Sequence, residues 1–341
     1  MSILITGAAG FIGFHLSKKL LEKGENLIAI DNISPYYDKN LKESRLKILE
    51  EKSALNKVGF KLFRSSINNS EIVDEIFKKY RPKIVFNLAA QAGVRYSLEN
   101  PYEYIQTNLV GFSNILECCR NHEVDHFIYA SSSSVYGGNT NIPFSENNSV
   151  DHPVSLYAAT KKSNELIAHS YSHLYGIPAT GLRFFTVYGP WGRPDMALFI
   201  FTKSIIEGKP IKVFNQGEMI RDFTYIDDII EGLLRIMIKP AKKDELFDSK
   251  NPSPASSWAP HRVFNIGNSA PTPLIDFIEA LENELGIKSK KILLPIQPGD
   301  VPVTSADTSL LQAWTEFKPN TPIKEGIRKF VYWYKDYYGI K

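Results

Sequence analysis

Near its amino end the chain reads Gly7-Ala8-Ala9-Gly10-Phe11-Ile12-Gly13. The apolar run Ile3–Ile5 before these residues predicts a short strand, and the amphipathic stretch Phe11–Lys23 predicts a helix that begins among the glycines. Glycines at such a junction allow a tight turn and a close approach of the backbone to a bound group. The helix N-terminus adds free N–H groups and a positive dipole. The pattern therefore predicts a turn that binds a pyrophosphate.

Short apolar runs alternate with longer amphipathic stretches through the first half of the chain. Further strands are predicted at Leu27–Ile30, Phe60–Phe63, Ile84–Leu88, Phe127–Ala130 and Phe264–Ile266. Strands separated by helical crossovers cannot pair as hairpins, so they pair in parallel and are covered by helices on both faces. The sequence thus predicts an α/β fold with a doubly wound parallel sheet, a Rossmann fold.

A carboxylate stands where the second predicted strand ends. Asp31 lies eighteen residues after Gly13, where it would accept hydrogen bonds from the ribose of an adenosine. It would also repel a 2′-phosphate, and the neighbouring Asn32 supplies no positive charge, so NAD is favoured over NADP. After the fourth strand, the small residues of Leu88-Ala89-Ala90-Gln91 would let the cofactor lie across the sheet edge, although a merely buried strand end is the alternative.

The length of the chain favours two domains. Its 341 residues exceed the ~250–300 at which a single core usually stops growing. After Gly181 the alternation of apolar runs and amphipathic stretches becomes less regular, and prolines interrupt the segments. We expect residues 1–183, with returning segments near 224–240 and 262–268, to bind NAD, and residues 184–341 to form mainly a smaller α/β substrate domain. The polar stretch from Lys242 to Pro260 is predicted to be a surface loop.

Composition excludes several classes of protein. Forty Lys and Arg against 37 Asp and Glu give a net charge of +3 without a long basic block, so a nucleic-acid binder is not expected. No apolar run approaches the ~20 residues that a bilayer requires, and no leader segment is recognised at the amino end. The two cysteines, Cys118 and Cys119, are adjacent and poorly placed for a disulfide. We expect a cytoplasmic protein.

A second group of residues suggests proton transfer. Tyr157 and Lys161 are four residues apart, so on a helix they share a face and the ammonium would lower the pKa of the phenol. A phenolate produced in this way can take a proton from a hydroxyl. The fifth strand ends in a serine run, whose hydroxyls could bridge substrate and phenol. We favour Ser132 as the catalytic serine and Ser134 as a substrate contact, with Ser133 as an alternative.

Together the glycine turn, the serine strand end and Tyr-x-x-x-Lys resemble the extended short-chain dehydrogenase/reductase family, over essentially the whole chain. Several segments are more specifically similar to UDP-glucuronate 4-epimerases. They include Tyr36-Tyr37-Asp38, Leu41-Lys42-Glu43-Ser44-Arg45-Leu46, Gln91-Ala92-Gly93-Val94-Arg95-Tyr96-Ser97 and the long segment from Arg183 to Ala197. The last of these is the most specific.

The resemblance implies a reaction and its residues. Ser132, Tyr157 and Lys161 would form the catalytic triad of a reversible C4 epimerisation of UDP-glucuronate to UDP-galacturonate, through a 4-keto intermediate and with tightly bound NAD. Further cofactor contacts are expected from Ser66, Ile67, Asn108 and Phe185. A place in surface polysaccharide synthesis is also implied.

The resemblance also implies the substrate contacts. Arg221 would bind the diphosphate, and Thr186 with Arg193 would bind the sugar carboxylate, a role for which Arg95 competes. The remaining expected substrate contacts are Ala197, Phe214, Tyr225 and Asp300. A homodimer is implied through two helices of each subunit, within residues 102–121 and 155–175.

Other functions stay open. A UDP-glucuronate decarboxylase or nucleotide-sugar dehydratase would carry an acidic residue at Ser134, which disfavours both. A 4-epimerase of neutral or N-acetylated UDP-hexoses is a further alternative, and so is a non-catalytic NAD-binding scaffold, which would not need Tyr157 and Lys161. His169 and His173 are four residues apart without a nearby glutamate, so no metal site is predicted.

Overall fold

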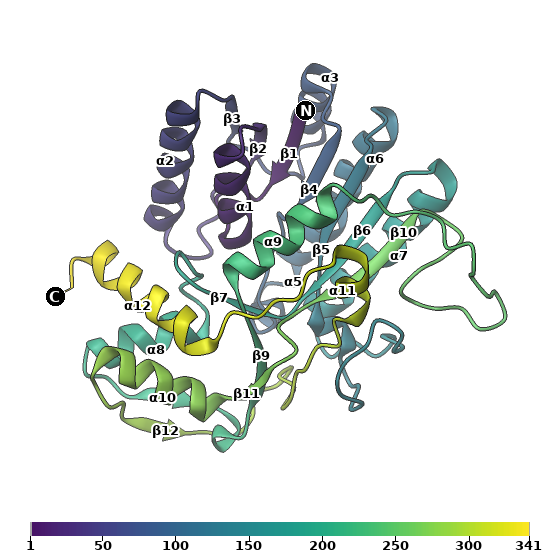
Figure 1. Ribbon diagram of the computed structural model, residues 1–341. Helices are drawn as coiled ribbons and strands as arrows, with labels where there is room; N and C mark the ends of the chain where they lie inside the picture. Colours follow the sequence, from purple (N-terminus) through teal and green to yellow (C-terminus); the bar gives the residue numbers. More distant parts are fainter. Residues whose placement is uncertain (1, 341) are drawn as a thin grey trace.

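The computed structural model describes residues 2–340 and is built on a seven-stranded parallel sheet (Figure 1). The spatial order of the strands is β10-β6-β5-β4-β1-β2-β3. Their bounds are β1 (Ser2–Thr6), β2 (Asn26–Ile30), β3 (Phe60–Phe63), β4 (Ile84–Asn87), β5 (His126–Ser132), β6 (Ala179–Phe184) and β10 (His261–Ile266). The predicted fold class is confirmed, and β2 ends one residue before Asp31.

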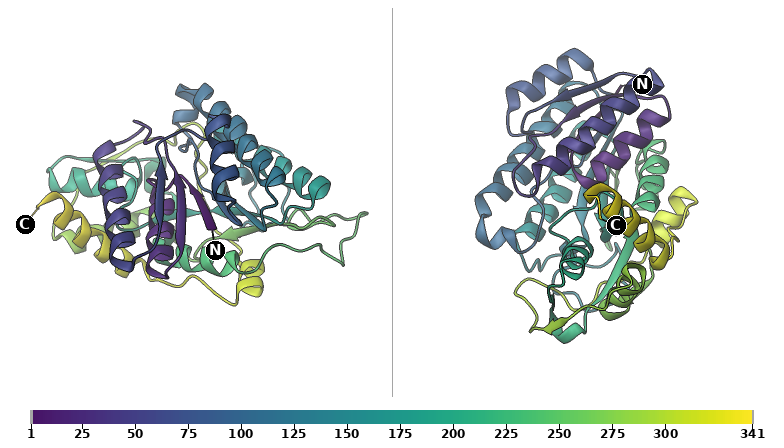
Figure 2. Two further views of the ribbon diagram at one scale, coloured as in Figure 1. Left: turned by 90° about the horizontal axis from the view of Figure 1, so that it is seen from above. Right: turned by 90° about the vertical axis from the view of Figure 1, so that its left-hand side faces the viewer.

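Helices cover both faces of this sheet (Figure 2). One face packs against α1 (Phe11–Glu22), α2 (Lys39–Asn56) and α9 (Ile226–Met237), and the other against α3 (Ser70–Tyr80), α6 (Phe112–Asn121) and α7 (Leu156–Tyr175). Because successive strand residues point to opposite faces, Ile3 and Ile5 belong to the first core and Leu4 to the second. The sheet is therefore buried on both sides.

Short helical segments surround the carboxyl ends of β4 and β5. After β4 come α4 (Tyr96–Glu99), α5 (Pro101–Tyr104) and a π-helical segment (Ile105–Gly111) that runs into α6. A 3₁₀ turn (Ser133–Tyr136) follows β5 directly. These segments place polar groups around the end of the sheet at which the glycine turn lies.

The second half of the chain adds a smaller α/β body. Two small sheets, β11-β9-β7 and β12-β8, pack with helices α8, α10 and α12. The bounds are β7 (Thr186–Tyr188), α8 (Ala197–Ile206), β8 (Ile211–Val213), β9 (Ile220–Tyr225), β11 (Pro271–Pro273), α10 (Leu274–Leu285), β12 (Lys291–Leu293), α11 (Ser309–Thr315) and α12 (Ile323–Tyr338), with a 3₁₀ turn at Asn215–Gly217. We propose that the boundary between the two domains lies near residue 183.

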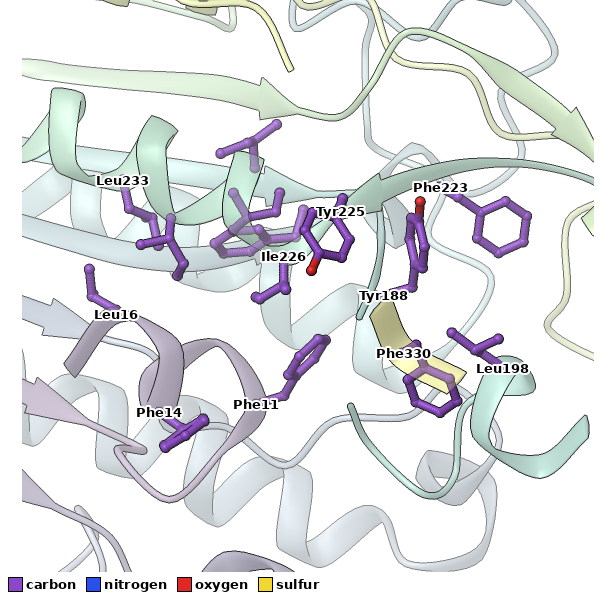
Figure 3. Close-up of a cluster of buried hydrophobic side chains, with 14 of the residues drawn as sticks. Phe11, Phe14, Leu16, Tyr188, Leu198, Phe223, Tyr225, Ile226, Leu233 and Phe330 are labelled. Carbon is purple, nitrogen blue, oxygen red and sulfur yellow. The ribbon is translucent and has the colours of Figure 1, made fainter. Parts of the chain in front are cut away.

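One hydrophobic cluster joins the two bodies. Figure 3 shows Phe11 of α1 facing Ile226 of α9, with Phe14 further along α1 and with Tyr188, Phe223 and Phe330 from the smaller body. Two returning elements, α9 and β10, belong to the large sheet and its covering layer. The shared core fixes the smaller body against the carboxyl ends of the large sheet.

Residues 242–260 form a loop without helix or extended strand, which projects to the right in Figure 1. Within the described residues, no helix is long and apolar enough to cross a membrane. Cys118 and Cys119 are buried free thiols in α6.

Candidate active site

A cavity of about 910 Å³ lies between the two bodies, at the carboxyl ends of β1, β2, β4, β5 and β6. Ligands of open parallel sheets bind at this edge, where the strand order reverses on either side of β1. The cavity brings together all the predicted site residues except Asn108 and Tyr225. Those lining it are Gly7, Gly10, Phe11, Ile12, Gly13, Asp31, Asn32, Ser66, Ile67, Leu88, Ala89, Ala90, Gln91, Arg95, Ser132, Ser134, Tyr157, Lys161, Phe185, Thr186, Arg193, Ala197, Phe214, Arg221 and Asp300.

The glycine turn is too tight for side chains. Gly7 has φ +76°, and a Cβ on Gly13 would lie 2.1 Å from the carbonyl oxygen of Gly7. Gly10 is the N-cap of α1 and offers no side-chain cap, so the first N–H groups of the helix are free of intrahelical acceptors. Because these groups border the cavity, the turn fits a pyrophosphate.

Asp31 is fixed beside this turn. Its carboxylate accepts hydrogen bonds from the backbone N–H groups of Ala9 (2.9 Å) and Ile33 (2.8 Å). Lys42, from α2, also lines the cavity, and its Nζ donates to the carbonyl of Ser34 at 2.9 Å. The carboxylate is therefore held in the place that an adenosine ribose would reach, with a cation nearby that the sequence reasoning did not assign.

Two predicted contact residues do not line the cavity in the structure. Asn108 is buried behind the cavity wall, where it accepts from the Gln91 N–H (2.9 Å) and donates to the Gln91 carbonyl (3.0 Å). Tyr225 is buried at the far end of β9, where it packs edge-on against Tyr188 (Figure 3). Arg221 and Phe223 on the same strand do line the cavity. Asn108 thus supports the wall, and Tyr225 belongs to the core.

Ser132, Tyr157 and Lys161 converge at the end of β5. Ser155 caps α7 by accepting from the Ala158 N–H at 3.1 Å, which sets the start of the helix that carries Tyr157 and Lys161. The Ser132 side chain lies near the Tyr157 phenol and lowers its pKa as a hydrogen-bonding neighbour. The amine of Lys161 donates to the Ala130 carbonyl on β5 at 2.9 Å.

The electrostatics of the phenol differ from the expectation. Burial raises the pKa of Tyr157, while the hydrogen bond with Ser132 and the charge of Arg193 lower it. The sequence predicted that Lys161 lowers this pKa, but in the structure the cation that lowers it is Arg193. The Lys161 amine is directed to the Ala130 carbonyl, and burial lowers its own pKa to about 8.

Three arginines border the part of the cavity beyond Tyr157. Arg221 is partly buried and donates to the carbonyls of Ile220 (2.9 Å) and Pro302 (3.0 Å) rather than to a carboxylate. Arg95 pairs with Asp300 at 2.9 Å, which links the two bodies across the cavity mouth. Arg193 pairs with Asp195, and this ion pair lowers the pKa of the Asp195 carboxyl despite its burial. The region is suited to an anionic ligand.

Several cavity residues were missed by the sequence reasoning. Tyr36, Lys42, Tyr96 and Asp195 all line the cavity. Each lies inside a segment that signalled the family resemblance, but only the three-dimensional arrangement indicates what it contacts. The histidine pair is structural: His169 is hydrogen-bonded with Ser257, and His173 accepts from Trp258. Between residues 2 and 340, no cluster of three His, Cys, Asp or Glu side chains is arranged for a metal.

Comparison with protein-family models matches residues 3–267 to the NAD dependent epimerase/dehydratase family. The chain belongs to this family. Protein CapI of Staphylococcus aureus is 54% identical over 338 residues, which cover 99% of each chain. The probable UDP-glucuronate 4-epimerase of Rhizobium meliloti is 47% identical over 339 residues, which cover 99% of this chain and 98% of the relative.

A solved structure of the family also resembles the whole chain. UDP-glucuronic acid 4-epimerase from Bacillus cereus, in complex with UDP-glucuronic acid and NAD, has a TM-score of 0.86 and 34% sequence identity, covering 99% of this chain and 100% of that one. Epimerases of this family depend on NAD. The glycine turn, the free N–H groups of α1 and the fixed Asp31 fit this dinucleotide.

Proposed function

We propose that the protein catalyses the reversible C4 epimerisation of UDP-glucuronate to UDP-galacturonate. The observation that carries this proposal is that Ser132, Tyr157 and Lys161 meet at the end of β5 in a cavity that Arg193 also lines. A proton-transfer group thus lies beside a cation suited to a sugar carboxylate. The Rhizobium and Bacillus relatives support the same substrate.

Tyr157 takes the proton of the sugar 4-hydroxyl. The Ser132 hydroxyl bridges that hydroxyl and the phenol and passes the proton between them. When bound, NAD supplies the hydride acceptor and, on return, the hydride donor. Lys161 adds positive charge at the end of β5, and Arg193 favours the phenolate. A 4-keto sugar must then turn within the cavity, so that reduction takes place on its opposite face.

The proposed substrate contacts divide by chemistry. Arg221 is suited to the diphosphate because its guanidinium donates to the backbone carbonyls of Ile220 and Pro302. Its positive charge is therefore available to an anionic ligand. Thr186 and Arg193 would hold the C5 carboxylate, while Phe214, Ala197 and Asp300 line the side proposed for uridine. Ser134 is proposed as a sugar contact.

Decarboxylation and dehydration are less well supported. After oxidation at C4 the C5 carboxylate is β to a ketone, and further acid–base steps would need an additional group. Ser134, whose N–H donates to the Ser132 hydroxyl at 3.1 Å, stands where the related decarboxylases and dehydratases carry an acid. The cavity therefore favours return of the hydride over loss of carbon dioxide or water.

Product analysis tests the proposal. The purified protein is incubated separately with UDP-glucuronate, UDP-glucose and UDP-N-acetylglucosamine, and the products are separated chromatographically. We expect UDP-galacturonate as the main product. Efficient conversion of only the neutral sugars would support the 4-epimerase alternative, and a UDP-pentose would support a decarboxylase.

The variant Tyr157→Phe separates an enzyme from an NAD-binding scaffold. Loss of the proton acceptor should reduce turnover at least ~100-fold. Bound NAD, measured by mass spectrometry of the purified protein, should be retained. Unchanged turnover would contradict the proposed mechanism.

We also propose a homodimer through α7 and the helical segment that ends with α6. These helices carry exposed apolar side chains, including Tyr102, Val110, Leu166 and Leu174. A cytoplasmic location is proposed because the two cysteines are free thiols and the substrate is a nucleotide sugar. A role in polysaccharide synthesis is proposed from the resemblance alone.

A further inference from the structure

We propose that His15, Tyr36 and Arg45 brace the loop that carries Arg193, and that this bracing sets the preference for an acidic over a neutral sugar. We call residues 189–195 the arginine loop. The inference rests on the proposed function, because it assigns Arg193 to the substrate carboxylate. The three bracing residues act through Arg193 and are positioning residues.

The arginine loop has a backbone that is costly to hold in place. Trp191 has φ +60°, in the left-handed region that side chains disfavour, and Gly189 has φ +145°. Such conformations persist when surrounding groups fix them. Three successive carbonyls of the loop are indeed bound from outside it.

The backbone contacts come from α1 and α2. His15 Nε2 donates to the Pro190 carbonyl at 2.9 Å. Arg45 Nη2 donates to the carbonyls of Trp191 at 2.6 Å and Gly192 at 3.1 Å. The last of these carbonyls belongs to the peptide group that leads into Arg193, so the position of its main chain is fixed by the NAD-binding body.

Arg45 also contacts the cofactor turn. Its side chain is fully buried, and Nη1 donates to the Ala9 carbonyl at 2.7 Å and to the Tyr37 hydroxyl at 2.8 Å. One guanidinium therefore joins the glycine turn to the arginine loop. The compact ammonium of lysine cannot reproduce this planar, forked set of contacts.

A second set of contacts fixes the Arg193 side chain. Its Nε donates to Asp195 Oδ1 at 3.0 Å, and its Nη2 donates to Oδ2. The Tyr36 hydroxyl donates to the same Oδ2 at 3.1 Å. The Asp195 carboxylate is thus held between Tyr36 and Arg193, which sets the plane of the guanidinium and leaves further N–H groups for a ligand.

If the bracing residues only stabilised the fold, replacing them would weaken the binding of all UDP-sugars equally. If the bracing acts through Arg193, its loss would instead weaken the binding of the acidic substrate more, because a neutral hexose has no carboxylate for the guanidinium to contact. The discriminating quantity is therefore the ratio of dissociation constants for UDP-glucose and UDP-glucuronate. Tyr36→Phe changes one hydroxyl on a half-buried side chain, so it should fold normally.

The experiment measures both dissociation constants by calorimetry on NAD-containing protein carrying Tyr157→Phe, which prevents turnover. Tyr36→Phe should weaken UDP-glucuronate about threefold to tenfold, and Arg45→Lys about tenfold or more, while UDP-glucose changes less than about twofold. The matched control is Tyr337→Phe, which removes a hydroxyl contact to Ser44 (3.0 Å) beside Arg45. It should leave the ratio unchanged.

The outcomes separate the two claims. A preference for UDP-glucuronate that survives unchanged in Tyr36→Phe and Arg45→Lys overturns the bracing alone, as does an equal loss of both ligands. Equal binding of the two ligands before any bracing residue is changed overturns the proposed function instead.

Discussion

At the scale of single residues, the serine run after β5 poses the most specific question. Three consecutive hydroxyls, Ser132, Ser133 and Ser134, border the cavity, and spacing alone does not rank them. Ser132 is the serine of this run that lowers the pKa of the Tyr157 phenol, and its hydroxyl accepts from the Ser134 N–H at 3.1 Å. The geometry favours Ser132 as the proton relay and leaves Ser134 for the sugar.

Single substitutions should separate these roles. We predict that Ser132→Ala lowers kcat about tenfold to 100-fold with little change in KM, because the hydrogen bond that favours the phenolate is lost. Ser134→Ala should mainly raise KM. Steady-state kinetics with UDP-glucuronate checks both, and a larger loss of kcat in Ser134→Ala would reverse the assignment.

At the scale of secondary-structure elements, a buried ion pair joins the strands and helix that carry the catalytic groups. Arg183 on β6 donates to both oxygens of Glu165 on α7 at 2.9 Å, and Ser131 on β5 donates to the same carboxylate at 2.6 Å. Burial opposes ionisation of Glu165, but Arg183 lowers its pKa overall. Glu165 lies one helical turn after Lys161, so its bonds to Arg183 and Ser131 tie α7 to β6 and to the end of β5.

Breaking this pair on one side should be costly. Arg183→Met leaves the Glu165 carboxylate buried without its partner, so we predict a loss of about 3–5 kcal/mol in the free energy of unfolding. The double variant Arg183→Met, Glu165→Gln should lose less, because no unpaired charge remains. Urea unfolding measures both. A single variant within about 1 kcal/mol of the wild type would contradict a stabilising role.

The alternation of strands and helices predicted the main sheet because it depends on local period and on crossover rules. The same local signals located Asp31 and the Tyr157–Lys161 pair. They did not predict that Tyr225 belongs to the core, because a strand pattern does not show how many residues of the strand border the cavity. They also did not assign Arg45 or Tyr36, whose partners lie about 150 residues away in sequence.

At the scale of the whole molecule, exposed apolar side chains on the helical face predict association. Leu166 and Leu174 on α7 are 59% and 62% exposed. Light scattering at micromolar concentration should give twice the 38.6 kDa mass of one chain. Leu166→Glu should shift the mass toward the monomer, whereas Leu55→Glu, on α2 at the opposite face, should not. A monomeric wild type would contradict the dimer.

The buried histidines make stability depend on pH. Burial lowers the pKa of His126 to about 4 and that of His15 and His261 to about 3. The unfolded chain binds these protons near pH 6.5 and the folded chain does not, so stability falls as pH decreases below 6.5. Glu146, whose pKa burial raises to about 7, acts in the opposite direction between pH 4.5 and 7.

The destabilising effect of the three histidines at lower pH exceeds the opposite effect of the single glutamate. The urea midpoint should therefore decrease from pH 7.5 to pH 5.5. His126 contacts the Met237 carbonyl and the Thr180 hydroxyl in the core. His126→Gln should therefore make the decrease shallower, and Glu146→Gln should make it steeper. Parallel curves for the wild type and His126→Gln would show that this histidine is not the source.

The most direct test of the central claim follows the C4 hydrogen. The purified protein, without added NAD, is incubated with UDP-glucuronate in deuterated buffer, and the sugar protons are observed by NMR. We predict the appearance of UDP-galacturonate with its C4 proton retained, since the hydride leaves and returns within one cavity. Deuterium at C4 of the product, or the appearance of a UDP-pentose in its place, would contradict epimerisation by internal hydride return.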